Sequence, residues 1–513
     1  MKPKALLKAL VIIIALATLV TTLTVFSSCK AKDKTPDSDD SKNELENSNS
    51  ESESESESES LKLDKNGYLM DDLPEDLNTQ YLGQEIKILG WKDAECTEFS
   101  VDKITSNAID NSVYLRNQTI QNRLGVTLKF NLIKGNVNNI DSFKAEVTNA
   151  AAGEPYDIVA GYTRSIAVCS TAGYLFDLGH IKTENYLDFE KPWWNKSIIN
   201  ATKTIDGNLY FVTGDASTSL AQMTYCVYFN ADHRGLANNS PYTMVENNEW
   251  TLDNMLKITK GHYVNYGDTG IGLEDELGVI GHYYDWSALL HGCGVGIITR
   301  DSLGDFVLDE SIRGRGVTVM DKLSTYTRLD GGYVRGRNDD SAALLENFTS
   351  GKSMFLITES GSALTKLKNV NFEYGCVPCP KYEENQTSYI SAVRQPVTLF
   401  GIMKNVSTSR LPMVTAVLEC WGSEGYRKTT PAVFEQSMKG QVAASAKMVD
   451  MLEIIKNSAW FDCGRIYAVE TNYICDAPGD ALAGEFTWDA YLSQKLPQIE
   501  DTYIPLLSQM LNT

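Results

Sequence analysis

Strand-like and helix-like segments alternate, with short connections, in the first apolar part of the mature chain. Residues 84–91 favour a strand, residues 107–124 favour an amphipathic helix that ends at Gly125, and residues 126–133 favour a second strand. Residues 141–162 then run from a helix through a Gly-Glu-Pro turn into a third strand. Such alternation predicts a doubly wound α/β lobe.

The ends of these strands predict where a ligand would bind. In open α/β sheets, ligands lie beyond the carboxyl ends of the strands. This rule selects the loops Trp91–Asp93 and Gly161–Arg164 as segments that face a ligand cleft.

A Gly-Lys-Ser triplet at residues 351–353 resembles the end of a phosphate-binding loop. Such a loop needs an earlier glycine, a preceding strand and a following helix. Here Glu346 occupies the position of the earlier glycine, residues 339–348 favour a helix, and residues 353–358 favour a strand. The order is reversed, so we interpret Gly351 as the C-cap of a helix that leads into a buried strand, and we expect no ATP site.

The N-terminus has the features of a secretory signal. Three lysines precede an uncharged run from Ala9 to Phe26, and Ser27 and Ser28 lead to Cys29. Small residues before a cysteine resemble the bacterial lipobox, in which the cysteine is lipidated. We predict a signal peptide over residues 1–28 and lipidation of Cys29. An uncleaved signal anchor is the alternative, because Phe26 replaces the usual aliphatic residue.

An acidic tract at residues 29–60 ends in ESESESESES and contains almost no apolar side chain. Its composition predicts a disordered linker. The whole chain has a formal net charge of −21, which argues against nucleic-acid binding because phosphate contacts need a positive surface. We therefore expect a domain anchored by lipid at the extracellular face of a bacterial cell membrane.

The cysteines and histidines show no metal-binding or catalytic spacing. Of the ten cysteines, nine remain after Cys29, and they are scattered except for Cys376 and Cys379 in a CVPC sequence. That pair could be a redox site, but no second pair completes a zinc site. We interpret most thiols as small buried apolar groups and predict no metal and no cofactor.

Five segments occur in an order similar to that of the extracellular solute-binding proteins of ABC importers, in the carbohydrate group that includes maltose-binding protein. They are YDIVAGYTRSIAVCSTAGYLFDL, GNLYFVTGDASTSLAQMTYCVYFNADHRGLA, NEWTLDNMLKITK, FTSGKSMFLI and VTLFGIMKNVSTSRLPMVTAVLECWGSEGYRK. The resemblance covers nearly everything after Tyr81. It implies two doubly wound α/β lobes joined by crossing hinge strands, the first at residues 81–214 and 396–440 and the second at residues 215–395 and 441–513.

The resemblance also implies a function. A carbohydrate would be captured between the lobes by hinge closure, and a monomeric, non-enzymatic protein would deliver it to ABC permease subunits in the membrane. Sugars are bound by aromatic rings and by charged side chains that contact their hydroxyls. The candidate ligand-binding residues are Trp91, Asp93, Tyr162, Arg164, Asp215, Tyr284, Trp286 and Glu359.

Each candidate has a structural alternative. Trp91 and Trp286 could be core aromatics, Asp215 could cap a turn at the hinge, and Arg164 and Glu359 could be unrelated surface charges. The alternative functions are a cell-surface glycoside hydrolase that uses two carboxylates and a glycan-binding adhesin without a transporter. The sequence contains no nucleophile elbow and no zinc-binding helix. Peptides, polyols or uronates would use residues similar to those of a neutral sugar site.

Overall fold

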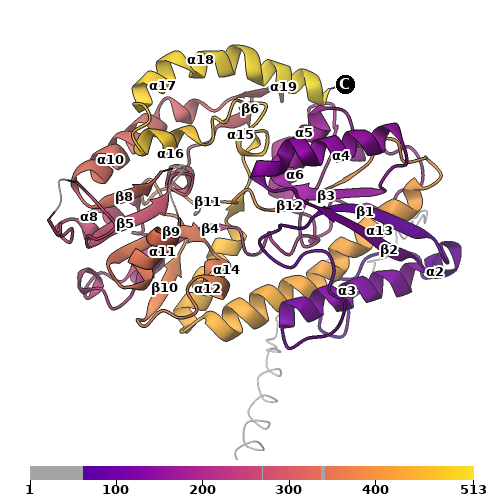
Figure 1. Ribbon diagram of the computed structural model, residues 1–513, viewed down its shortest axis with the longest axis horizontal. Helices are drawn as coiled ribbons and strands as arrows, with labels where there is room; N and C mark the ends of the chain where they lie inside the picture. Colours follow the sequence, from indigo (N-terminus) through magenta and orange to yellow (C-terminus); the bar gives the residue numbers. More distant parts are fainter. Residues whose placement is uncertain (1–61, 268–269, 337–340, 513) are drawn as a thin grey trace, which may run out of the picture. The chain divides into compact units, whose positions relative to one another are not determined.

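Two large β-sheets, each with helices packed against it, dominate the computed structural model (Figure 1). The structure describes residues 62–267, 270–336 and 341–512. The predicted signal peptide, Cys29 and the acidic tract lie outside these residues, so the expectations about them stay predictions.

The first sheet has four strands in the order β12-β3-β1-β2. They are β1 (Glu85–Trp91), β2 (Thr127–Ile133), β3 (Ile158–Tyr162) and β12 (Thr398–Ile402). β1 is parallel to β2 and β3, and β12 is antiparallel to β3. β3 is buried along its whole length, as expected for a strand covered on both faces. Because β1 and β3 are parallel neighbours, their carboxyl ends at Trp91 and Tyr162 meet at one edge of the sheet.

Helices cover both faces of this sheet, with α4 and α5 on one side and α3 and α13 on the other (Figure 1). The helices of this region are α2 (Leu77–Gln80), α3 (Ala108–Leu124), α4 (Ile140–Ala152), α5 (Thr163–Thr171), α6 (Lys196–Thr202) and α13 (Leu411–Glu424). The Asn107 side chain caps α3 by accepting hydrogen bonds from the N–H groups of Ile109 and Asp110. Gly125 ends α3 with a φ of 67°. The predicted helix and its C-terminal glycine are confirmed.

The second sheet has five strands in the order β10-β4-β9-β5-β8. They are β4 (Tyr225–Asn230), β5 (Leu277–His282), β8 (Gly332–Arg335), β9 (Ser353–Glu359) and β10 (Tyr374–Val377). β5 is parallel to β8 and β9, whereas β4 is antiparallel to β9 and β10. The first residue of β4, Tyr225, pairs with the last residue of β9, Glu359. One edge of this sheet therefore carries Tyr225, Glu359 and the carboxyl end of β5 at His282.

The Gly-Lys-Ser triplet connects α11 (Ser341–Thr349) to β9. Gly351 has a φ of 82°, and the N–H groups of Gly351 and Lys352 donate to the carbonyl oxygens of Phe348 and Asn347. The Lys352 ammonium donates to the carbonyl oxygen of Glu274 at 3.2 Å. The predicted order of helix, glycine turn and buried strand is confirmed.

The other elements are shorter or lie towards the C-terminus. The remaining α-helices are α7 (Pro241–Glu246), α8 (Leu252–Thr259), α9 (Ser287–Gly292), α10 (Arg315–Leu329), α12 (Ser362–Thr365), α14 (Ala446–Asn457), α15 (Cys463–Ile466), α16 (Ala477–Leu482), α17 (Trp488–Gln494), α18 (Leu496–Gln498) and α19 (Ile504–Leu511). The 3₁₀-helices are η1 (Val137–Asn139), η2 (Leu178–His180), η3 (Arg234–Leu236) and η4 (Glu310–Ile312), and the π-helices are η5 (Gly425–Thr429), η6 (Ala432–Val442) and η7 (Ile499–Tyr503). Two small sheets pair β6 (Ile298–Arg300) with β7 (Phe306–Leu308) and β11 (Ser391–Ala392) with β13 (Ala459–Trp460).

Two connecting segments run side by side between the large sheets, one at residues 212–225 and one at residues 392–398. Thr224 pairs with Val393 in an isolated bridge, and the Arg394 N–H donates to the neighbouring segment at 2.7 Å. A further connection continues from α13 through η5 and η6 to α14, which packs against β10. The residue boundaries expected for the two lobes stay a prediction.

The thiols of the described chain are free, and all except Cys96 are buried. Burial raises the pKa of both Cys376 and Cys379 to about 12. A thiol that is buried and hard to deprotonate is a poor nucleophile. The CVPC sequence is therefore a packing feature, and the interpretation of most thiols as buried apolar groups is confirmed.

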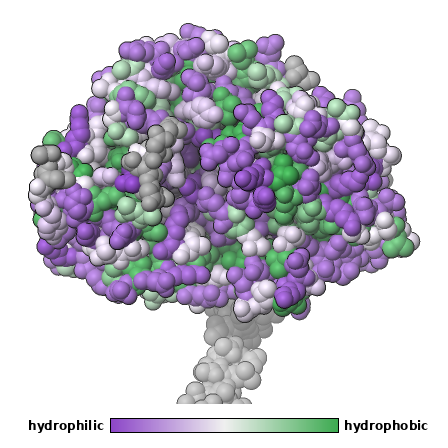
Figure 2. Space-filling view, in the orientation of Figure 1, coloured by the Kyte–Doolittle hydropathy of each residue, from purple (hydrophilic) through white to green (hydrophobic). Residues whose placement is uncertain are grey.

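Polar side chains predominate on the face shown in Figure 2, with apolar ones interspersed among them. Exposed large apolar side chains, such as Leu82, Leu303 and Leu329, lie in separate segments of the chain. Among the residues that the structure describes, no helix combines the length and the hydropathy needed to span a membrane.

Candidate functional site

A pocket of about 410 Å³ lies where the strand ends of the two large sheets face each other. Trp91 and Tyr162 come from the carboxyl ends of β1 and β3, Tyr225 starts β4, and Tyr283 follows β5. The topology of both sheets thus gathers aromatic rings at one place. We call this the strand-end pocket, lined by Trp91, Asp93, Glu95, Asn136, Val137, Tyr162, Arg164, Tyr225, Tyr283, Tyr284, Arg394, Gln395, Pro396, Arg465 and Asp476.

Five of the eight candidate residues line the strand-end pocket, namely Trp91, Asp93, Tyr162, Arg164 and Tyr284. The Trp91 ring lies 5.7 Å from the Tyr162 ring between centroids, and its indole N–H donates to Thr398 Oγ1 at 2.9 Å. Only 1% of Trp91 is exposed. Trp91 is therefore both a core residue and part of the pocket wall, so its two interpretations are compatible.

Arg164, near the start of α5, is held by the C-terminal part of the chain. Its Nη2 lies 3.0 Å from Asp476 Oδ1, and both side chains are buried. Its guanidinium also lies 5.3 Å from the centroid of the Tyr473 ring. Asp93, which follows β1, is partly exposed and accepts a hydrogen bond from the Gly135 N–H at 2.8 Å. Arg164 is thus an ion-paired wall residue, not an isolated surface charge.

Arg394 connects the two sides of the pocket. Its Nη1 lies 3.0 Å from Glu95 Oε2 and 3.5 Å from Glu359 Oε2, and its Nη2 donates to the Tyr284 hydroxyl oxygen at 2.8 Å. Burial acts to lower the pKa of Arg394, but Glu359 and other neighbours raise it well above its ordinary value. Since Glu95 follows β1 and Glu359 ends β9, this charged guanidinium bonds to residues of both sheets.

Glu359 is not itself part of the pocket lining. It is 3% exposed and accepts hydrogen bonds from the hydroxyls of Thr358 and Ser362, each at 2.9 Å. Burial acts to raise the pKa of Glu359, but Arg394 and Lys366 outweigh this effect and lower the pKa to about 2. The structure therefore makes Glu359 a positioning residue behind Arg394, whereas the sequence predicted a direct ligand contact.

Trp286 lies behind the pocket wall. It is fully buried, and its indole N–H donates to the Gly281 carbonyl oxygen at 3.2 Å. A Cβ at Gly281 would lie only 3.1 Å from the indole nitrogen. Tyr283 and Tyr284, which follow β5 directly, line the pocket instead, because the chain turns into α9 immediately after Trp286. The structure places Trp286 in the core, in agreement with its structural alternative.

Asp215 lines a different pocket, of about 410 Å³, together with Trp193, Thr430 and Lys456. Its carboxylate accepts a hydrogen bond from the Thr430 hydroxyl, and its N–H donates to the Trp193 carbonyl oxygen at 2.9 Å. Burial raises the pKa of Asp215 to about 6 even though Thr430 lowers it. These contacts fix the start of a connecting segment, and the strand-end pocket does not include Asp215.

Ten lining residues were not among the candidates: Glu95, Asn136, Val137, Tyr225, Tyr283, Arg394, Gln395, Pro396, Arg465 and Asp476. The positions of two of these residues in the sequence could have indicated that they line the pocket. Tyr225 begins an antiparallel strand, and the start of an antiparallel strand lies at the same edge as the ends of parallel ones. Arg394 lies three residues before Val397, the start of the last of the five family-like segments. Arg465 lies in the four-residue helix α15, and no periodicity or motif marks it.

A third pocket, of about 810 Å³, adjoins the strand-end pocket, and Glu95 lines both of them. It extends past Cys96 towards α12 and Tyr374, and its lining is mainly small polar and aliphatic side chains. Because ligand sites combine apolar or aromatic walls with a few convergent polar groups, the strand-end pocket is the better candidate.

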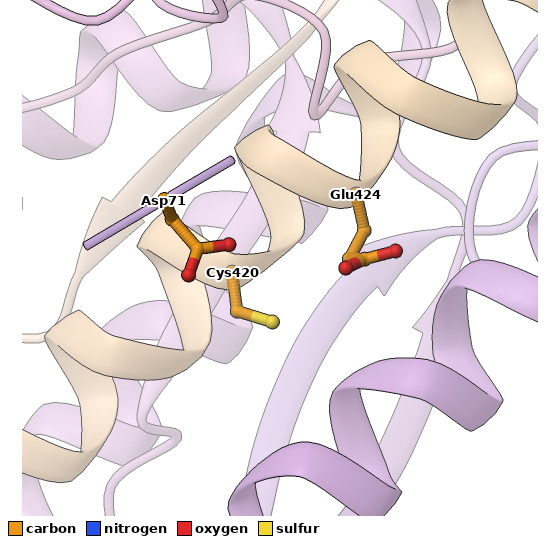
Figure 3. A group of neighbouring side chains, drawn as sticks. All are labelled: Asp71, Cys420 and Glu424. Carbon is orange, nitrogen blue, oxygen red and sulfur yellow. The ribbon is translucent and has the colours of Figure 1, made fainter. Parts of the chain in front are cut away.

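A group of three potential metal ligands lies elsewhere, on and beside α13. Figure 3 shows Asp71 next to Cys420 and Glu424, whose ligand atoms lie within 4.8 Å of one another. The Arg123 guanidinium already bonds to this group, at 2.6 Å from Asp71 Oδ1 and 3.2 Å from Glu424 Oε1. Its Nη1 also lies 3.6 Å from Cys420 Sγ. We call Asp71, Arg123, Cys420, Glu424 and Arg427 the Asp71 cluster; since its cationic position is taken by arginine, it is an ion-pair cluster.

Comparisons with known proteins bear on the fold. No protein-family model and no curated protein sequence matches the chain. The solved structures include a cyclo/maltodextrin-binding protein complexed with maltotetraose, with a TM-score of 0.51 and 13% identity over 84% of this chain and 97% of that chain. The maltose/maltodextrin-binding domain MalE from Bdellovibrio bacteriovorus, bound to maltotriose, gives a TM-score of 0.49 and 13% identity over 84% and 100%. At this identity the first comparison shows a shared fold, which confirms the expected α/β architecture.

Proposed function

We propose that this chain is a solute-binding protein that captures a carbohydrate in the strand-end pocket and does not turn it over. The observation that carries the proposal is the pocket itself. Five aromatic side chains, from β1, β3, β4 and the segment after β5, share it with three arginines and three carboxylates. Rings suit the C–H faces of a sugar and charged groups suit its hydroxyls. The shared fold with a maltodextrin-binding protein supports this assignment.

Closure of the two sheets around the ligand is part of the proposal. Arg394 lies in a connecting segment and bonds to Glu95 on one side and to Glu359 on the other. A ligand that contacts Arg394 would act on both sides of the pocket at once. Hinge motions that close two lobes around a ligand need only a few residues in such connections.

The anchoring and the transport partner are proposed from the sequence. Signal-like residues 1–28, the cysteine at position 29 and the acidic tract that follows suit a lipoprotein held at the extracellular face of the cell membrane. The partner would be the permease of an ABC importer. Replacing Cys29 by alanine should abolish incorporation of radiolabelled palmitate and release the protein from the membrane fraction; unchanged labelling would refute lipidation at Cys29.

Ligand binding is tested by a thermal-shift screen of the purified protein against a glycan panel, followed by calorimetric titration. A ligand that binds only the folded state raises the melting temperature by mass action, by an amount that depends on its concentration relative to Kd. Prolonged incubation with the bound glycan and product analysis by chromatography should recover the glycan intact. Sustained release of shorter sugars would assign the protein to the glycoside hydrolases instead.

A further inference from the structure

Among the residues that the structure describes, the arginines of the strand-end pocket pair with carboxylates, with one exception. Arg164 pairs with Asp476 at 3.0 Å. Arg394 pairs with Glu95 at 3.0 Å, and it shares Glu359 with Lys366. These three cations are balanced by three carboxylates within the chain. The exception is the third arginine of the lining, Arg465.

Arg465 is a buried cation held by neutral groups. It is 6% exposed, and its Nη1 donates to Ser287 Oγ at 3.0 Å and lies 3.4 Å from His291 Nε2. Its Nε is buried and has no hydrogen-bond partner, and within the described chain no carboxylate oxygen lies within 4.0 Å of its guanidinium nitrogens. The Asp462 carboxylate interacts with Arg465 through space but makes no ion pair with it. A buried charge without a directly bonded counter-charge is costly.

The two partners of Arg465 do not neutralise it. His291 Nδ1 lies 2.8 Å from the Val295 carbonyl oxygen, which can only accept, so Nδ1 carries the hydrogen and Nε2 is the acceptor that faces Arg465. Burial and Arg465 lower the pKa of His291 to about 3, and the ring is therefore neutral. The Ser287 hydroxyl donates to the Tyr284 carbonyl oxygen at 2.7 Å and accepts from Arg465.

Asp462, at the N-terminus of α15, is the acid nearest to Arg465 along the chain, but it serves backbone groups. Its two carboxylate oxygens accept hydrogen bonds from the N–H groups of Ile297, at 2.9 Å, and of Arg465, at 3.2 Å. It caps the short helix that carries Arg465 and thereby fixes where that side chain begins. The guanidinium itself belongs to the lining of the strand-end pocket and lies 5.8 Å from the centroid of the Tyr225 ring.

We propose that the ligand of the strand-end pocket is an anionic carbohydrate, whose carboxylate pairs with Arg465 while its sugar ring packs against the aromatic wall. This inference rests on the proposed function and narrows its substrate class to acidic sugars such as uronates. The planar guanidinium matches a planar carboxylate in two parallel hydrogen bonds. The net charge of the whole chain, −21, disfavours an anionic ligand in general. The positive charge of Arg465 would favour an anion at this one position.

The first experiment compares matched probes on the unmodified protein by calorimetric titration. The pairs are trigalacturonic acid with its methyl ester, methylglucuronosyl-xylotriose with xylotetraose, and sulfated lactose with lactose. We expect an acid of the first two pairs to bind about tenfold to hundredfold more tightly than its neutral counterpart, as hydrogen bonds to charged groups do. The third pair separates a carboxylate from a sulfate, and preference for the sulfate alone would overturn the carboxylate assignment.

The second experiment uses Arg465→Gln, which removes the charge and keeps a donor for Ser287. Affinity for the acidic probe should fall about tenfold to hundredfold more than affinity for its neutral counterpart. Arg313→Gln is the matched control, because Arg313 pairs with Glu500 outside the pocket lining. It should leave both affinities unchanged. If Arg465→Gln does not fold, the comparison of matched probes on the unmodified protein still decides the question.

The outcomes separate this inference from the proposed function. Equal or tighter binding of a neutral sugar would overturn the anionic assignment and leave carbohydrate capture intact. Failure of every acidic and neutral sugar to bind or to raise the melting temperature would overturn carbohydrate capture itself. Equal loss of acidic and neutral binding in Arg465→Gln would show that Arg465 only maintains the shape of the pocket.

Discussion

The Asp71 cluster and the strand-end pocket both bury charged side chains, but they differ in what completes their pairing. In the Asp71 cluster, Arg123 and Arg427 each bond to both Asp71 and Glu424. The chain itself supplies every partner that this cluster needs. In the strand-end pocket, the side-chain hydrogen-bond partners that the described residues offer to the Arg465 guanidinium are the neutral Ser287 and His291.

This difference separates stability from binding. The Asp71 cluster connects the segment before α2 to α3 and α13 through ion pairs within the chain. It leaves no charge unpaired for a ligand. A pocket that leaves a buried cation unpaired is less favourable for folding but prepared for an anion. Mutations in the first region should therefore affect unfolding, and mutations in the second should affect ligand affinity.

The largest effects are expected from replacing two tryptophans, one behind the pocket wall and one in it. Trp286→Ala should cost about 3–5 kcal/mol of unfolding free energy and leave ligand affinity unchanged, because Trp286 is fully buried behind the pocket wall. Trp91→Ala should lower stability and also weaken ligand binding about thirtyfold, since Trp91 lines the pocket. Urea unfolding and calorimetric titration on both variants measure the two quantities. Loss of affinity with unchanged stability in Trp286→Ala would contradict this placement.

The next effect would break the internal pairing of the Asp71 cluster. Asp71→Asn should cost about 3 kcal/mol of unfolding free energy, because it leaves Arg123 and Arg427 short of one counter-charge. Ligand affinity should stay the same. Asp72→Asn is the control: the Asp72 side chain is 67% exposed and pairs with Lys191 on the surface, so it should change stability by less than about 1 kcal/mol. Equal effects of the two substitutions in urea unfolding would contradict the pairing argument.

A pH titration tests the pairing behind Arg394. Because the pKa of Glu359 is lowered to about 2 in the folded protein, its contribution to stability is fully present above its ordinary pKa of 4.5. That contribution is lost as the pH falls from about 4.5 towards 2. Glu359→Gln should therefore reduce the loss of unfolding free energy between pH 4.5 and pH 2 by about 3 kcal/mol. Identical acid limbs in urea unfolding of the variant and the parent protein would rule out this role.

The smallest effect probes a single hydroxyl of the pocket. Tyr284→Phe removes the acceptor of Arg394 Nη2 and keeps the ring, so unfolding free energy should fall by about 1 kcal/mol or less. Ligand affinity should fall about fivefold, because Arg394 loses one of the bonds that orient it. Tyr266→Phe, at an exposed tyrosine outside the pocket lining, is the control and should change neither quantity.

The sequence was most informative where strands are parallel. The carboxyl ends of β1 and β3 gave Trp91 and Tyr162, and both line the strand-end pocket. This works because parallel neighbours end at one edge whatever else surrounds them. The helix before β9 and its Gly351 cap were equally predictable, because both depend on local backbone geometry.

The sequence was least informative where a residue depends on tertiary packing. Trp286 follows β5 almost as closely as Tyr284 does, and only the start of α9 turns one ring into the core and leaves the other at the pocket. Arg465 and Asp476 reach the pocket from a C-terminal segment of short helices, whose course no periodicity encodes. Sequence patterns therefore predicted the type of each element but not the path of the chain between elements.

The free, buried thiols have a consequence for how the folded domain is produced and maintained. None of the cysteines in the described part of the chain is disulfide-bonded, so we expect folding to need neither an oxidant nor a disulfide isomerase. The domain should fold in a reducing cytosol, and dithiothreitol should leave its melting temperature unchanged. Burial also limits oxidation of these thiols, except the partly exposed Cys96, because susceptibility follows thiolate character and exposure.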